Sequence, residues 1–90
     1  MATLGVKIKI MPESLDTDLN AIKEQGKEKI AKEGGVANNF DEEEIAFGLK
    51  ALIVTLAWPE GKDTELIEHA FTSIPGVSSV SVLDVRRVIG

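Results

Sequence analysis

A stretch of ten residues, Leu49 to Trp58, is apolar at both odd and even positions and is interrupted only by Lys50 and Thr55. A strand that is apolar on both faces needs neighbours on all sides, so this run predicts a strand in the middle of a sheet. It is also far shorter than the roughly 20 apolar residues that cross a bilayer. The fold is therefore expected to be built around this strand.

A second strand is predicted from the strict alternation of Leu4 to Ile10, which places Lys7 and Lys9 on one face and apolar side chains on the other. A period of two indicates a strand with one buried face. The strand is expected to end at Met11 to Ser14, because Pro12 cannot donate a backbone hydrogen bond.

Two further strands have weaker patterns. A short strand near Val36 to Glu43 carries the acidic run Asp41 to Glu44. The segment Val77 to Ile89 begins with valines at even positions and then changes parity at Leu83, which predicts a β-bulge or bend inside that strand.

A helix is expected from about Asp16 to Glu33, with Ser14 or Asp16 as its N-cap and Gly34-Gly35 as its end. Gly26 in its middle costs about 1 kcal/mol relative to alanine, so we expect it to mark close packing against a strand. The predicted apolar face of this helix consists of Leu15, Leu19, Ile22, Gly26 and Ile30.

A second helix is predicted to begin after the turn Pro59 to Lys62, with Asp63 as its N-cap, and to stop at Pro75-Gly76. Its apolar stripe comprises Leu66, Ile67, Ala70, Phe71 and Ile74.

The resulting order, β-α-β-β-α-β, together with right-handed crossovers, favours an α+β fold of the ferredoxin-like type. We expect an antiparallel sheet in the order 4-1-3-2, both helices on one face and the other face uncovered. The 90 residues are expected to form a single domain.

Composition excludes several functions. Fifteen acidic and ten basic residues give a net charge of −5. This balance argues against general binding to DNA or RNA, which relies on Lys and Arg contacts to phosphates, and it favours a basic partner. The absence of cysteine removes thiolate nucleophiles and Cys-ligated metal sites. The single histidine, His69, is expected to be an ordinary surface or boundary residue. The start of the chain lacks a signal-peptide pattern, so a soluble cytoplasmic protein is expected.

Three features remain as possible sites. The acidic run Asp41 to Glu44 lacks the spacing of a calcium loop and is expected to be a solvated edge. Phe47, beside Gly48, could project from the end of the sheet or could be a satellite core residue. Arg86 and Arg87 could act on an anion or could be ordinary surface cations.

Three stretches, Lys7 to Ser14, Ile45 to Leu52 and Val82 to Ile89, resemble the archaeal elongation factor 1-beta family. The resemblance carries the motifs Met-Pro-Glu-Ser, Ile-Ala-Phe-Gly-Leu and Asp-Val-Arg-Arg, and it extends over essentially the whole chain in the same order. That family is similar to the exchange domain of the eukaryotic factor, which has the ferredoxin-like fold.

The resemblance implies a guanine nucleotide exchange factor that promotes replacement of GDP by GTP on elongation factor 1-alpha, without bond chemistry of its own. It implies no cofactor on this chain, since the nucleotide and magnesium are expected on the partner. We also expect no direct contact with nucleic acid, from the acidic balance, no contact with a membrane, and a monomer or weak oligomer.

The resemblance also suggests which residues bind the partner. Phe47 matches a docking phenylalanine, and Gly48 and Lys50 flank it. Arg87 matches a lysine that reaches the magnesium and phosphate region, with Arg86 as its rival. The implied mechanism has the ring and the cation pressed into the partner's guanine nucleotide pocket.

Ferredoxin-like domains have many functions, so the fold alone does not identify an exchange factor. A small-molecule regulatory domain of the amino-acid-binding type is the main alternative, with Met11 to Ser14 lining its ligand cleft. An acylphosphatase-like hydrolase would need an arginine in a glycine-bearing loop after the first strand, and the loop of this chain has neither residue. An RNA-recognition module would need exposed aromatic residues on the sheet, and it is disfavoured because the chain has only three Phe, one Trp and no Tyr.

Overall fold

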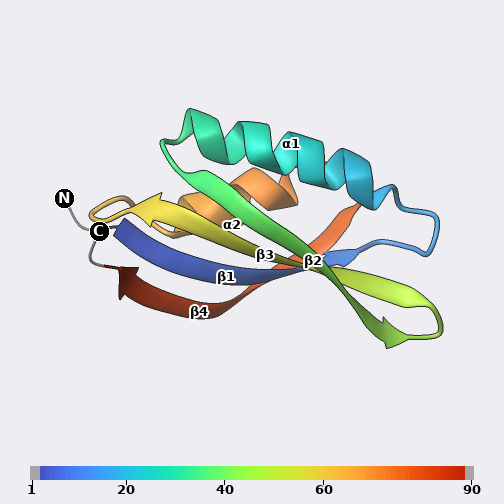
Figure 1. Ribbon diagram of the computed structural model, residues 1–90. Coiled ribbons are helices and arrows are strands. Elements are labelled where there is room, and N and C mark those ends of the chain that lie inside the picture. Colours follow the sequence, from blue (N-terminus) through green and yellow to red (C-terminus); the bar gives the residue numbers. More distant parts are fainter. Residues whose placement is uncertain (1–2, 89–90) are drawn as a thin grey trace.

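The computed structural model of this chain describes residues 3–88, and its elements follow the predicted order (Figure 1). Ile89, the last residue of the predicted C-terminal strand, lies outside the described residues. The elements are β1 (Thr3–Pro12), α1 (Leu19–Lys32), β2 (Val36–Ala46), β3 (Leu49–Pro59), α2 (Glu65–Thr72) and β4 (Val77–Val88).

The four strands form one antiparallel sheet in the order β2-β3-β1-β4, which confirms the predicted topology and the central position of β3. Both helices lie on one face of this sheet (Figure 1). The protein therefore has the expected ferredoxin-like α+β fold. Within residues 3–88, neither helix is long and apolar enough to cross a membrane.

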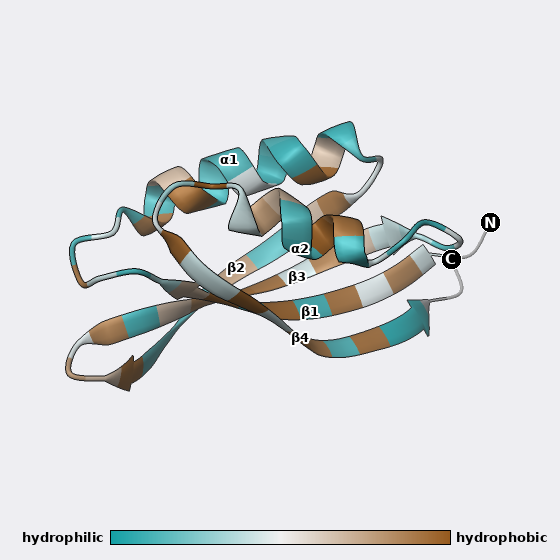
Figure 2. Cartoon of the chain, turned by 180° about the vertical axis from the view of Figure 1, so that it is seen from behind, coloured by the Kyte–Doolittle hydropathy of each residue, from teal (hydrophilic) through white to brown (hydrophobic). Residues whose placement is uncertain are grey.

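The core lies between the sheet and the helices, on the side to which the even-numbered residues of β1 point. Figure 2 shows apolar and polar residues alternating along β1, as the period of two predicts. The largest fully buried side chains are Trp58, Phe71, Ile8, Ile10, Ile22 and Ile30.

No element among the described residues covers the opposite face of the sheet, where charged residues of neighbouring strands lie side by side (Figure 1). Lys7 pairs with Asp84, and Lys9 lies 3.8 Å from Glu43 of β2. The aliphatic part of such side chains can cover apolar surface while the charge stays in water. Ile53, which is opposite Lys9, is accordingly only 8% exposed.

Helix α1 begins later than predicted. Its N-cap is Asp18, whose carboxylate accepts hydrogen bonds from the backbone amides of Asn20 and Ala21. Ser14 and Asp16 do not cap it, because Ser14 and Thr17 instead close a separate turn through their hydroxyl groups. Leu15, which follows Ser14 in this turn, consequently lies outside the helix and is 64% exposed.

Gly26 does mark a close contact, but with the other helix and not with a strand. A β-carbon at this position would collide with the ring of Phe71 in α2. The glycine therefore allows α1 and α2 to pack side by side above the sheet.

The remaining elements refine the predictions. β2 extends to Ala46, beyond the expected end at Glu43. Thr64 precedes α2, although the Asp63 carboxylate still accepts a hydrogen bond from the Glu65 amide at 2.9 Å. The predicted bulge in β4 is confirmed, since Lys7 pairs with Asp84 and Ile8 pairs with Val82, which leaves Leu83 without a partner in register.

Candidate functional site

The β2–β3 hairpin projects beyond the helical layer at one end of the molecule (Figure 1). Its turn consists of Phe47 and Gly48, with φ angles of 52° and 80°, between the paired residues Ala46 and Leu49. Two central residues with positive φ are typical of a type I′ turn, whose twist suits a hairpin. A shift in register leaves Ile45 as an extra residue just before the turn.

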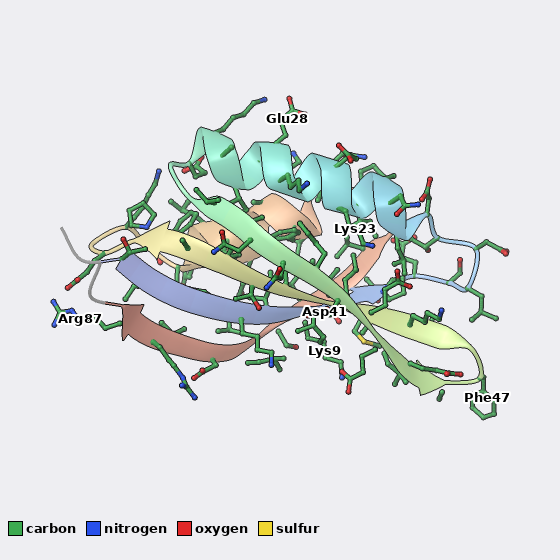
Figure 3. The ribbon with its side chains drawn as sticks, in the orientation of Figure 1. Lys9, Lys23, Glu28, Asp41, Phe47 and Arg87 are labelled. Atoms are coloured by element: carbon green, nitrogen blue, oxygen red, sulfur yellow. The ribbon has the colours of Figure 1, made fainter. Side chains whose placement is uncertain are left out.

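Phe47 is the exposed tip of this hairpin. Its ring points away from the body (Figure 3), and the residue is 98% exposed. It is the only residue other than glycine with positive φ among those described, and this conformation costs roughly 1–2 kcal/mol for a residue with a β-carbon. The interpretation of Phe47 as a satellite core residue is therefore wrong.

The flanks of the hairpin carry the acidic run, which takes part in ion pairs between neighbouring elements. Glu42 lies 3.4 Å from Lys23 of α1 and 3.8 Å from Lys50 of β3. All four acidic residues are exposed, and residues 3–88 contain no group of three metal-ligating side chains. The run is thus a solvated edge strand, as predicted, and its charge discourages pairing with other chains.

The β1–α1 loop lies beside this turn. A β-carbon placed on Gly48 would lie 3.8 Å from Cδ2 of Leu15. Sequence reasoning assigned Leu15 to the buried face of the helix and so missed it as a surface residue. The only local signal was the pair of hydroxyl residues that flank it, Ser14 and Thr17.

Arg86 and Arg87 point to opposite faces of the sheet because they are consecutive residues of a strand. Arg86 pairs with Gly5 on the uncovered face, and its Nε donates a hydrogen bond to Asp84 at 2.7 Å. Arg87 pairs with Leu4 on the face that the helices cover, and its guanidinium forms an ion pair with Glu60. A partner that approaches one face can therefore use only one of the two arginines.

Arg87 also lies at the rim of a cavity of about 650 Å³ between β3, the start of β2 and the β3–α2 loop. Its partner Glu60 could not be identified from the sequence, because the two residues are 27 positions apart and are brought together only by the sheet register. Other residues lining this cavity include Thr3, Val36, Ala57, Trp58 and Pro59.

Phe47 and Arg87 lie at opposite ends of the molecule (Figure 3). The turn immediately precedes Leu49 at one end of β3, and Arg87 lies near Pro59 at the other end. Ten steps of about 3.3 Å separate the ends of β3, or roughly 33 Å, in a molecule whose longest axis is 42 Å. The ring and the cation therefore cannot enter one nucleotide pocket together, which corrects that part of the expected mechanism.

Known proteins that are similar to this chain belong to one family. A family model described as the EF-1 guanine nucleotide exchange domain matches residues 5–88. The chain is 49% identical to elongation factor 1-beta of Methanosarcina barkeri (strain Fusaro / DSM 804), over 98% of this chain and 100% of the relative. It is 43% identical to elongation factor 1-beta of Methanothermobacter thermautotrophicus, over 99% of this chain and 100% of the relative. It is 38% identical to the protein of that name from Halorubrum lacusprofundi, over 98% of this chain and 100% of the relative.

Proposed function

The chain belongs to the family of EF-1 guanine nucleotide exchange domains, and on that basis we propose that it promotes the replacement of GDP by GTP on elongation factor 1-alpha during translation elongation. The observation that carries the proposal is the fully exposed Phe47 on a strained turn at the end of a projecting hairpin. Strain of this kind persists where it serves a function, and a rigid aromatic ring is a typical anchor for protein recognition.

In this proposal the protein holds its partner at two separate points. Phe47 docks into an apolar pocket on the partner, and the flanking Gly48 allows the turn to approach closely. Arg87 acts at the far end of the sheet, towards the phosphate and magnesium region of the nucleotide site. The separation of the two groups along the 42 Å axis supports contact with two different regions of a larger protein.

The cation would act by electrostatics. A GTPase holds GDP through its phosphate loop and through Mg²⁺. A guanidinium brought close to the metal disfavours metal binding, because the two positive charges repel each other. The guanidinium can also pair with oxyanions in a bidentate manner. Of the two arginines, Arg87 is the one that borders a hollow surface, whereas Arg86 lies on the uncovered face of the sheet.

Exchange then follows from thermodynamic linkage. The factor binds the nucleotide-free partner more tightly than the GDP-bound partner, so the factor and GDP weaken each other's binding. No bond is made or broken by this chain, the nucleotide and magnesium are those of the partner, and the reaction takes place in the cytoplasm. The net charge of −5 supports association with a basic partner.

The proposal is tested by measuring release of fluorescently labelled GDP from purified elongation factor 1-alpha in excess GTP. We expect this chain to accelerate release at a concentration below that of the partner, since each molecule acts repeatedly. An unchanged release rate, with a partner that exchanges nucleotide normally when EDTA removes its magnesium, would contradict the proposal.

A further inference from the structure

We propose that the turn of residues 14–17, with Leu15 at its apex, forms a second part of the surface that binds elongation factor 1-alpha at the hairpin end. This inference rests on the proposed function and extends it to a loop that the resemblance does not assign. The partner surface it requires is an apolar depression wide enough to take both Phe47 and Leu15, with basic groups around it.

The first argument is that two exposed apolar residues lie on neighbouring turns. Leu15 is 64% exposed and Phe47 is 98% exposed, and Leu15 lies beside Gly48, the residue that follows Phe47. Figure 1 shows the β1–α1 loop at the same end of the molecule as the hairpin turn. Between the loop and the turn lies a hollow of about 270 Å³ whose lining is mixed, with Leu15, Leu19 and Leu49 beside the polar residues Ser14, Thr17 and Lys50.

The second argument is that the turn is held in shape before any partner binds. The amide of Ser14 donates to Thr17 Oγ1 at 3.2 Å, and the Thr17 amide donates to the carbonyl of Ser14 at 3.3 Å. The Glu13 amide donates to the carbonyl of Gly76 at 2.9 Å, which ties the loop to the α2–β4 connection. A rigid loop loses little conformational entropy on binding, so its exposed side chain is well suited to recognition.

A single exposed leucine needs no explanation by itself. Leu15 differs because it lies beside the turn that carries an aromatic residue exposed at an energetic cost, and because its own turn is held by hydrogen bonds. Exposed apolar side chains on neighbouring preorganised turns are well placed to enter one protein interface.

The third argument is charge. Glu13, Asp16 and Glu44 surround the two apolar residues along the chain, and each is exposed. Within residues 3–88 none of these carboxylates forms a salt bridge, in contrast to Glu42 and Glu43 of the same end. Unpaired carboxylates around an apolar centre complement a partner with basic side chains around an apolar pocket.

The experiment compares Leu15→Ser with Leu83→Ser. Leu83 is a matched control, because it is also an exposed leucine, at 49%, but it belongs to β4 and lines neither the hollow beside Leu15 nor the cavity beside Arg87. The dissociation constant for elongation factor 1-alpha and the rate of GDP release are measured for both variants and the wild type. The thermal transition of each variant shows that it is folded.

We expect Leu15→Ser to weaken binding roughly tenfold, which corresponds to about 1.4 kcal/mol, and to slow exchange accordingly. Leu83→Ser should remain within about twofold of the wild type. A photocrosslinking side chain at position 15 should also label elongation factor 1-alpha, and one at position 83 should label it far less.

Two negative results are distinguishable. If the wild type neither binds elongation factor 1-alpha nor accelerates GDP release, the proposed function itself fails, and this inference fails with it. If the wild type does both, but Leu15→Ser behaves like Leu83→Ser and position 15 does not crosslink, the turn is not part of the interface and only this inference is overturned.

Discussion

Phe47 occupies a backbone conformation that its side chain disfavours. A type I′ turn prefers Asn-Gly, whereas this chain has Phe-Gly with φ of 52° at the phenylalanine. In the free molecule the ring gains almost no packing energy that could offset this cost, because the residue is 98% exposed. Stability and partner binding should therefore depend on this residue in opposite directions.

The substitution Phe47→Asn separates these two effects. We expect it to raise the free energy of unfolding by about 1 kcal/mol, because asparagine tolerates the left-handed conformation, and to slow GDP exchange roughly tenfold or more, because the anchor is lost. Thermal denaturation and the GDP-release assay measure both. Phe47→Ala is the control that removes the ring but keeps the β-carbon, and it should slow exchange without raising stability. A variant that loses several kcal/mol would instead indicate that the ring is packed.

The two arginines make a similar comparison possible. We expect Arg87→Ala to slow exchange more than Arg86→Ala, because only Arg87 lies on the side of the 650 Å³ cavity. Both ion pairs are solvent-exposed and each contributes at most about 1 kcal/mol, so neither variant should unfold. The second-order rate constant of GDP release is the appropriate measure. A larger effect at Arg86 would assign the role to the uncovered face.

At the scale of elements, the end of α1 is held by a lysine from a distant loop. The ammonium of Lys62 lies 3.0 Å from the Glu33 carboxylate, donates to the Glu33 carbonyl, and lies 5.7 Å from the centre of the Trp58 ring. The indole of Trp58 in turn donates to the carbonyl of Lys62 at 3.1 Å. A cation at this position complements the negative end of the helix dipole.

We therefore expect Lys62→Met to lower the free energy of unfolding by about 1–2 kcal/mol, because the helix end loses its cap and the ring loses its cation. Denaturant titration followed by circular dichroism measures the change. Lys32→Met serves as the control, since Lys32 is also a cation in the last turn of α1, and its pair with Glu28, 72% exposed on both sides, should contribute less than about 0.5 kcal/mol. The control therefore separates the direct contacts of Lys62 from the general effect of a cation near the helix end. Equal losses in the two variants would refute the capping role.

The sequence predicted most elements because their patterns are local. Alternation along β1, the change of parity at Leu83 and the apolar run of β3 all depend on which face is buried, and the structure confirms them. The start of α1 was misplaced because Leu15 lies four residues before Leu19 and so matches the helical spacing. The hydroxyl groups of Ser14 and Thr17, which compete with the helix for backbone hydrogen bonds, decide the outcome.

The contacts between distant elements could not be predicted in this way. The approach of Gly26 to Phe71 and the ion pair of Arg87 with Glu60 depend on how the helices and strands are placed in three dimensions. The exposure of Phe47 is of the same kind, because a Phe-Gly pair in a connection does not reveal whether the ring folds back. The candidate site was thus predicted as a set of residues, but not as an arrangement.

At the scale of the whole molecule, the placement of Phe47 and Arg87 at opposite ends predicts independent contributions to exchange (Figure 3). Residues that share no contacts and are more than about 10 Å apart usually contribute additively. The double variant Phe47→Asn, Arg87→Ala should therefore have a second-order rate constant of GDP release reduced by the product of the fold-reductions of the two single variants. The coupling free energy of this cycle should be below about 0.5 kcal/mol. Strong coupling in this cycle would show that the two groups act on one site.

One uninterrupted strand, β3, joins the two ends, and this sets the reach of the protein. Its 11 residues act as a fixed spacer between the ring and the cation. Any lengthening of the hairpin must come in steps of two residues per strand, about 7 Å, because a single added residue turns the tip to the other side of the ribbon. The partner's two contact regions must therefore match a distance that this protein can change only in coarse increments.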